Sequence, residues 1–290
     1  MDAILLYALA GILYAALAAH LWNTRWRGHK DAALTKWERG AILVPLGLHS
    51  YLLWASLVLS EELHFGFSQA LSVMTWLAVA IYWIESLFVR LEGMQPLVLG
   101  TAALCAVLPA IFPGLASQSY SHSLEFRLHL VLAMLAYSLF TLAALHAFLM
   151  TVVEQRLHGG PMRAGGAKTA ATAAGGPLTG PLSGLPPLLT LEALLFRIVG
   201  MGFVLLTLTL VTGAVFSETL FGKAFQFNHK TLFALVSWFI FAALLAGRHF
   251  YGWRGRTALR WTLTGFVMLL LAYVGSRFVL EVILHRPPSL

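Results

Sequence analysis

The sequence predicts an all-α, polytopic integral membrane protein with about eight transmembrane helices. Of its 290 residues, 59% are hydrophobic and only 11% are charged, whereas soluble domains carry about 25% charged residues. Apolar runs of roughly 20 residues can each cross a bilayer core as a helix. The runs lack the alternation of membrane β-strands. They lie at about 3–22, 40–59, 68–89, 95–115, 125–152, 192–217, 229–250 and 259–283.

The first run is predicted to be an uncleaved helix with its amino terminus outside. A secretory signal carries positive charge in front of its apolar segment, but here only Asp2 precedes it. The basic residues follow the run instead, at Arg25, Arg27 and Lys30. Because basic residues stay on the cytoplasmic side, this order predicts that the first helix begins outside and ends at the cytoplasmic side.

The remaining loops extend this orientation to the whole chain. Lys and Arg collect in alternate connections, at 23–39, 90–94, 153–191 and 251–258. The intervening connections, 60–67, 116–124 and 218–228, hold few or none. The positive-inside rule then puts both termini outside, which we expect to be the periplasmic side of a bacterial inner membrane. It also accounts for the net charge of +7, so no nucleic-acid partner is expected.

We expect residues 1–290 to form a single membrane domain in contact with the lipid bilayer. Residues 159–187 are rich in Gly, Ala and Pro, a composition typical of a flexible linker. Its predicted place is cytoplasmic, between the fifth and sixth helices. It serves either as a spacer or as a docking segment for a partner protein.

Several kinds of chemistry have no support in the sequence. The single cysteine, Cys105, lies in an apolar run, and no C-x-x-C or C-x-x-C-H motif is present, so neither thiol redox chemistry nor covalent haem attachment is expected. No nucleophile–base pair, carboxylate dyad or phosphate-binding loop is visible, so we do not expect an enzyme. Apart from histidines, Glu85 and Arg197 are the candidate intramembrane polar residues of a transporter, but no matched pair of broken helices accompanies them.

The eleven histidines separate by predicted depth. His20, His146 and His249 fall near cytoplasmic helix ends, where an interfacial position is expected. His49 and His129 fall inside the second and fifth runs. Ionisable residues at membrane depth are costly and usually face the interior of a bundle. Each is therefore either a structural histidine bonded to a neighbouring oxygen or a metal or cofactor ligand.

A non-covalent haem b is the cofactor that we expect for His49 and His129. Neutral imidazole is a common axial ligand of haem iron. At 1.5 Å per residue their predicted depths differ by roughly 7 Å, an offset that two imidazoles can bridge across a haem. No metal other than haem iron is expected.

A polar interruption precedes the seventh run, in the stretch AFQFNHK. Phe225 and Phe227 could pack against a planar ligand beside His229, or could belong to the aromatic belt of a membrane protein. Three cations, Arg127, Lys230 and Arg277, also lie near outer helix ends. They either extend to the interface as snorkelling side chains or bind the propionates of a haem.

The stretch from Leu205 to Gly255 resembles the core of the CcsA-type cytochrome c assembly proteins. In that family a short SGAVW segment ends one helix, and a tryptophan-rich loop, WGxxWxWDPKETW, leads into the next. Here 212–215 reads TGAV, Lys230 matches the lysine of the loop, and the turn is GWRG. Phe221, Phe225 and Phe227 stand at the tryptophan positions, Asn228 at the aspartate and His229 at the proline.

Two flanking segments extend the resemblance over helices five to eight, with 191–285 as the assembly-like core. His129 is similar to an outward-facing haem-ligating histidine of the family, and Tyr137 follows it at the family's spacing. Residues 272–277, AYVGSR, resemble YFGVN in the last helix. The phenylalanines and the GWRGR turn resemble the divergent YpjD-like and HemX-like branch.

The resemblance implies a haem-binding membrane protein that acts in haem handling or cytochrome c biogenesis at the outer face. Its implied partners are haem and other cytochrome c assembly or haem-synthesis proteins. The alternative is a haem-free regulatory or scaffolding protein that acts on haem synthesis or on another membrane complex.

Overall fold

The structure is a computed structural model that describes residues 2–27, 34–59, 65–88, 93–114, 124–158, 188–221 and 229–284. Within these ranges every regular element is helical, which confirms the all-α prediction. The helices are α1 (Asp2–Leu21), α2 (Lys36–Leu57), α3 (Phe67–Phe88), α4 (Gln95–Ile111), α5 (Leu124–His158), α6 (Leu188–Phe221), α7 (His229–Tyr251), α8 (Gly255–Leu270) and α9 (Ser276–Phe278). Shorter π-helical segments are Trp22–Arg27 after α1, and Leu271–Gly275 and Val279–Ile283 on either side of α9.

The predicted membrane spans are confirmed as helices. Seven helical stretches among the described residues are long and apolar enough to cross a membrane. The remaining predicted run, 95–115, corresponds to α4, which is apolar but has only 17 residues. The chain is therefore a polytopic membrane protein. α5 and α6, with 35 and 34 residues, continue well beyond the roughly 20 residues that a bilayer requires.

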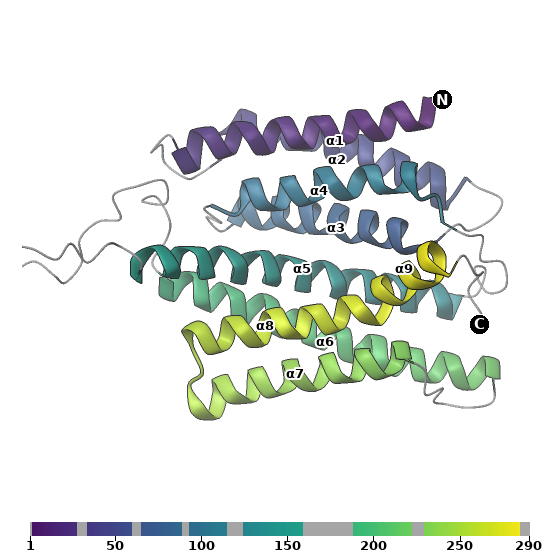
Figure 1. Ribbon diagram of the computed structural model, residues 1–290, viewed down its shortest axis with the longest axis vertical. Helices are drawn as coiled ribbons and strands as arrows, with labels where there is room; N and C mark the ends of the chain where they lie inside the picture. The colour runs from purple at the N-terminus through teal and green to yellow at the C-terminus, as the bar shows by residue number, and fades with distance from the viewer. Residues whose placement is uncertain are drawn as a thin grey trace, which may run out of the picture.

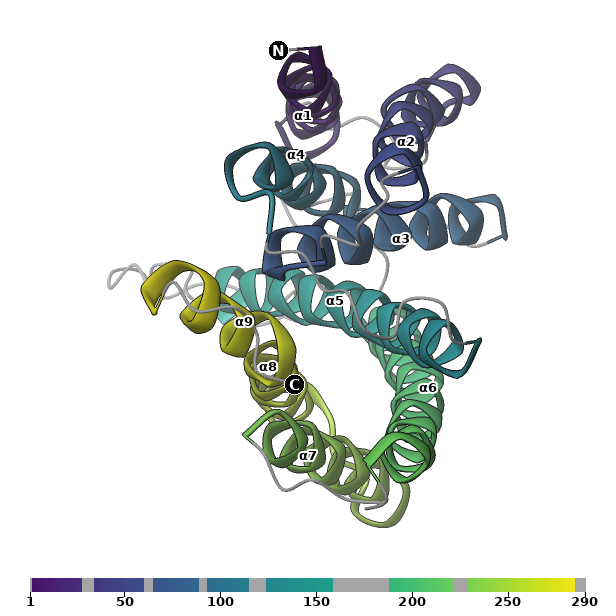
Figure 2. The same ribbon diagram turned by 90° about the vertical axis from the view of Figure 1, so that its right-hand side faces the viewer.

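The helices lie side by side along one direction and divide into two groups (Figures 1 and 2). In the first group, α1 packs against α2 and α4, and α4 packs against α3. In the second, α5 contacts α6 and α8, and α7 contacts both α6 and α8. α3 packs on α5 and joins the two groups. One apolar core runs through both.

A pair of phenylalanines holds the second group together. The rings of Phe140 on α5 and Phe241 on α7 stack with their centroids 3.9 Å apart and an angle of 18° between them. Both side chains are fully buried. Gly202 of α6 lies against the Phe140 ring, where a Cβ would come within 3.2 Å of it. The absence of a side chain there lets α6 approach α5 closely, as small residues do between membrane helices.

The two ends of the second helix group carry different functional residues. The start of α5, the end of α6, the start of α7 and α9 lie at one end, called here the α9 end (Figure 1). The end of α5, the start of α6 and the turn between α7 and α8 lie at the opposite end, called here the turn end. The arginines of the turn and the candidate haem residues of α5 and α7 are thus at opposite ends of the bundle.

The GWRG sequence forms the tight connection between α7 and α8. Gly252 and Gly255 adopt positive φ values of 65° and 55°, a region that glycine enters without steric cost. The Trp253 backbone N–H donates to the Gly247 carbonyl at 3.1 Å. The Trp253 indole covers Gly247 so closely that a Cβ at that position would overlap it. These glycines therefore let α8 reverse direction within three residues.

The predicted interfacial position of His146 is wrong. Its side chain is fully buried. Nε2–H donates to the Leu191 carbonyl at 2.8 Å, and Nδ1 lies 2.8 Å from Met94 Sδ. The expectation placed His146 near the end of an apolar run, but α5 continues as a helix to His158. His146 is consequently an interior residue that ties α5 to α6.

Candidate functional site

His129 lies near the start of α5 and is held by α6. Its Nδ1 is 3.1 Å from the hydroxyl oxygen of Thr212. The Thr212 hydroxyl donates its proton to the carbonyls of Leu208 and Thr209, at 2.9 and 3.1 Å. When that proton goes to one of these carbonyls, Nδ1–H of His129 is the donor to Thr212. The neutral imidazole then carries its lone pair on Nε2, the nitrogen available to a metal.

Gly213 gives the His129 imidazole its position. A Cβ on Gly213 would lie 3.1 Å from His129 Cε1, closer than ordinary van der Waals contact. The imidazole thus rests against bare backbone of α6, beside the threonine that orients it. The sequence comparison selected both His129 and residues 212–215, but only the structure shows that they touch.

Arg277 on α9 forms the second feature of the α9 end. Its side chain is 12% exposed, and its nearest carboxylate oxygen, Glu281 Oε1, is 3.8 Å from Nη1. Its guanidinium carbon lies 5.7 Å from the centre of the Tyr273 ring. Within the described residues, Nε and Nη1 are buried without a hydrogen-bond acceptor. A buried guanidinium with unused donors is suited to an additional carboxylate.

Lys230 adds a second positive charge. It is the second residue of α7, is partly buried, and lies close enough to Arg277 for their charges to repel each other. Lys230, Arg277 and Glu281 are called here the basic cluster. The cluster has an excess of positive charge, to which the amino-terminal end of α7 contributes further. It therefore favours an anionic group.

Glu281 anchors the basic cluster to the first helix group. Its Oε2 accepts the backbone N–H of Phe67, at the start of α3, at 3.3 Å. Tyr273 donates its hydroxyl to the Phe65 carbonyl, also at 3.3 Å. Sequence reasoning did not select Glu281 or Tyr273, although an acidic residue four positions after Arg277 in an apolar segment is a usable signal.

His49 lies elsewhere, in the first helix group. Its side chain is fully buried, with Nε2 2.8 Å from the Ser72 hydroxyl oxygen of α3. The Tyr14 ring of α1 meets it edge-on at a centroid distance of 5.8 Å. Nδ1 has no partner within the described residues. The imidazole is enclosed on all sides, so a porphyrin does not fit against it in this conformation.

The structure does not bring His49 and His129 together. Their hydrogen-bond partners are on α3 and α6, and Figure 2 shows α3 between α2 and α5. A haem held by both imidazoles would require the two helix groups to rearrange. The two histidines stay separate candidates, and of the two His129 has the geometry of a ligand.

The remaining predicted site residues are His229, Arg127, Phe225 and Phe227. His229, the first residue of α7, is exposed and adjoins the basic cluster through Lys230. Arg127 is exposed on α5. Because residues two apart do not share a helix face, it does not point to the same side as His129. Phe225 and Phe227 lie outside the described residues.

The arrangement at the α9 end has features of a binding site. Among the described residues, no group of three or more His, Cys, Asp or Glu side chains could hold a metal ion. A haem iron needs fewer protein ligands because its porphyrin supplies four nitrogens. One oriented imidazole and two cations match a haem, with its iron and its two propionates. The residues present therefore fit this group.

Comparison with known proteins gives a family match. The model of a family described as cytochrome C assembly protein matches residues 46–284, which include both His49 and His129. No solved structure gives a significant match.

Curated relatives resemble one segment of the chain. The inner membrane protein YpjD of Escherichia coli is 41% identical over 99 residues, which are 34% of this chain and 37% of that protein. The cytochrome c biogenesis protein CcsA of Gloeobacter violaceus is 36% identical over 92 residues, 32% of this chain and 27% of that protein. The matched segments thus span about a third of the length of these relatives or less.

Proposed function

Because the chain belongs to the cytochrome c assembly protein family, we propose that it binds haem b non-covalently near the α9 end. In this role it holds haem for haem handling or cytochrome c biogenesis and does not itself catalyse a reaction. The observation that carries the proposal is the hydrogen bond between His129 and Thr212. This bond leaves Nε2 of a partly buried imidazole free to ligate iron, at the same end of the bundle as the basic cluster.

Each residue of the proposed haem site would have its own role. Haem supplies an iron that accepts an imidazole and two propionates that carry negative charge. Thr212 holds the His129 ring in one tautomer and one orientation. Arg277 and Lys230 provide cations for the propionates, while Tyr273 and Glu281 fix Arg277 in place. His229, Phe225 and Phe227 stay candidates for the rim of the site.

We further propose that the α9 end faces the periplasm and the turn end the cytoplasm of a bacterial inner membrane. The turn end carries Arg248, Arg254, Arg256 and Arg260, as the positive-inside rule requires for a cytoplasmic face. The name of the YpjD relative, an inner membrane protein, supports the location. Haem at the α9 end would then be accessible to periplasmic cytochrome c assembly proteins.

Absorption spectroscopy of matched variants tests haem binding. Protein purified in detergent should show a Soret band that is lost in His129→Ala and weakened in Arg277→Gln. His249→Ala is the matched control, because His249 is exposed and lies at the turn end of α7, far from the α9 end, with the Phe250 ring 4.9 Å away. His49→Ala separates the two histidines and should retain the band.

Other outcomes would redirect the proposal. Loss of the band in His49→Ala with retention in His129→Ala would move the ligand to the first helix group. A band that survives both substitutions would contradict histidine ligation by either residue.

A haem-free regulatory or scaffolding role is the alternative. The enclosed position of His49 and the phenylalanines at the tryptophan positions favour it. Colourless protein that co-purifies with a haem-synthesis or cytochrome c assembly protein would support this role. Deletion of 160–187, within the predicted linker, should then weaken the association.

A further inference from the structure

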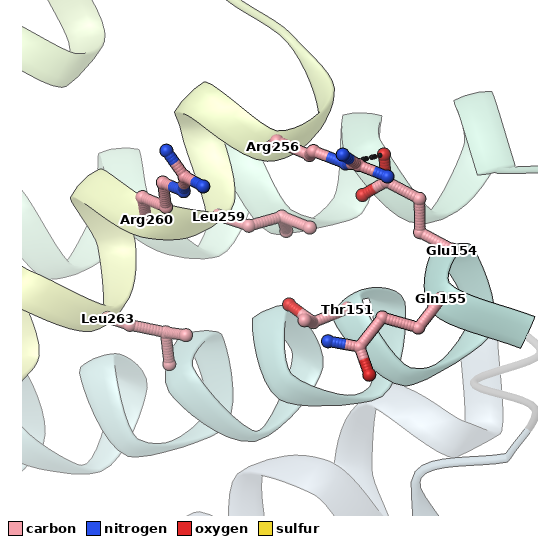
Figure 3. Close-up of a pocket in the computed structure, with 7 residues that line it drawn as sticks. All are labelled: Thr151, Glu154, Gln155, Arg256, Leu259, Arg260 and Leu263. Carbon is pink, nitrogen blue, oxygen red and sulfur yellow. Dashed lines mark hydrogen bonds and ion pairs between the residues drawn. The ribbon is translucent and has the colours of Figure 1, made fainter. Parts of the chain in front are cut away.

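A cavity of about 290 Å³ lies at the turn end, between the last turns of α5 and the first turns of α8. It is remote from His129 and the basic cluster, which lie at the α9 end. Figure 3 shows Arg256 and Arg260 along one wall and Thr151 and Gln155 on the opposite wall. Leu259 and Leu263 lie between them, along the α8 side.

The charges around this cavity are not balanced. Arg256 Nε lies 2.8 Å from Glu154 Oε1, and Arg248 Nη1 lies 2.5 Å from Glu192 Oε1. Arg254 approaches the same Glu192 oxygen only to 3.8 Å. Arg260 makes no ion pair within the described part of the chain. Among the described side chains at this end, the four arginines Arg248, Arg254, Arg256 and Arg260 thus lie beside two carboxylates, Glu154 and Glu192.

The start of α8 adds to the positive potential. The first turn of a helix has unpaired N–H groups and the positive end of the helix dipole. Acidic residues are favoured there, yet α8 begins with Arg254 at the N-cap, followed by Arg256. The Arg254 side chain makes no capping hydrogen bond. An anion at this position would offset both the unpaired donors and the clustered arginines.

The position of the cavity points to a ligand that is anionic at one end and apolar at the other. Among the described residues, the apolar stretch of α5 that is long enough to cross a membrane extends to Gln155, and that of α8 starts at Gly255. The cavity lies at these two limits, beside the arginines of the turn end, and basic residues of this kind are typical of a membrane boundary. Leu263, one turn further along α8 than Leu259, leads from the cavity toward the apolar zone.

We propose that an anionic phospholipid of the adjoining leaflet binds here, with its phosphate against the exposed arginines at the edge of the cavity and the start of an acyl chain in the apolar interior. Arg260 is the principal contact, and Arg256 contributes while it stays paired with Glu154. The Gln155 amide donates from the opposite wall; the Thr151 hydroxyl already donates to the Ala147 carbonyl at 2.8 Å. The volume is at the lower limit of small-molecule pockets, roughly 300 Å³, which suits the first part of an acyl chain that continues along α8.

Thermal unfolding of the full chain in detergent tests the proposal, with phosphatidylglycerol, phosphatidylcholine or inorganic phosphate added in separate samples. Phosphatidylglycerol should raise the unfolding midpoint more than phosphatidylcholine does, and inorganic phosphate should have a smaller effect than either lipid. Arg260→Gln should weaken the apparent affinity for phosphatidylglycerol about fivefold, given roughly 1 kcal/mol for one basic residue near an anionic surface. Arg127→Gln is the control, because Arg127 is an exposed arginine at the α9 end, remote from the cavity.

Equal shifts with the two lipids, or equal losses in the two variants, would overturn the proposal. A shift that inorganic phosphate reproduces in full would reject a lipid as the source of the phosphate. Native mass spectrometry of the unmodified chain with the same two lipids gives an answer even if Arg260→Gln does not fold. Preferential retention of phosphatidylglycerol supports the site, and equal retention contradicts it.

Discussion

Two threonines of α6 provide a test of how His129 is oriented. Thr212 donates to the Leu208 carbonyl at 2.9 Å and accepts from the His129 imidazole of α5 at 3.1 Å. Thr207 donates to the Phe203 carbonyl at 2.8 Å and accepts from the Trp238 indole of α7 at 2.9 Å. The two residues have the same chemistry on the same helix but different partners.

Replacement of either threonine by valine should cost a similar amount of stability. Valine keeps the branched shape and removes the acceptor, so one interhelical hydrogen bond is lost in each variant. Such bonds in membrane proteins contribute about 0.6 kcal/mol on average and about 1.7 kcal/mol at most. The remaining Nδ1–H or indole N–H is left without an acceptor, which places the expected loss in the upper half of that range.

Only Thr212→Val should change haem binding. Without its acceptor the His129 ring is free to change tautomer or to turn, and loss of such a supporting partner typically lowers metal affinity about 10- to 100-fold. The assays are reversible unfolding in mixed micelles for stability and the Soret band for haem. Equal Soret bands in Thr212→Val and Thr207→Val would refute the role given to Thr212. Unchanged stability in both would refute the hydrogen bonds themselves.

Three further substitutions have defined outcomes. Phe241→Ala should destabilise the protein by roughly 3–5 kcal/mol, because it leaves a cavity against Phe140. Phe239 is 63% exposed, so Phe239→Ala should change stability by about 0.5 kcal/mol or less. Equal losses in unfolding assays would contradict the assignment of Phe241 to the core. Gly213→Ala should raise the stability of α6 by up to about 1 kcal/mol, but it should displace the His129 imidazole and weaken the Soret band. A stronger Soret band would contradict the contact between Gly213 and His129. Glu281→Gln should lower stability by about 1–3 kcal/mol and reduce haem retention, because Arg277 loses the carboxylate that holds it in place; unchanged retention would contradict this positioning role of Glu281.

Much of the fold follows from the length and spacing of apolar runs. In a membrane, the backbone N–H and C=O groups of each run must form hydrogen bonds within the protein. A single apolar run can do this only as a helix. Pairing between helices was not predictable from the runs. It depends on local details such as Gly202 against Phe140 and the stacking of Phe140 on Phe241.

The candidate site was predictable in its residues but not in its pairings. His129 was selected because polar groups at membrane depth are costly, and Arg277 because it is a cation near an outer helix end. Depth along a helix gives no direction around it, so the sequence could not show that His49 faces Tyr14 and Ser72 rather than His129. His146 was misjudged for a related reason, since the apolar run ends before the helix does.

A haem titration of the purified protein tests the central claim most directly. Haem added in steps to the chain in detergent should produce a Soret band that saturates, and His129→Ala should show no saturable band although it stays folded. A wild-type titration that rises without saturation, as haem partitioning into detergent does, would contradict a specific haem site in this protein.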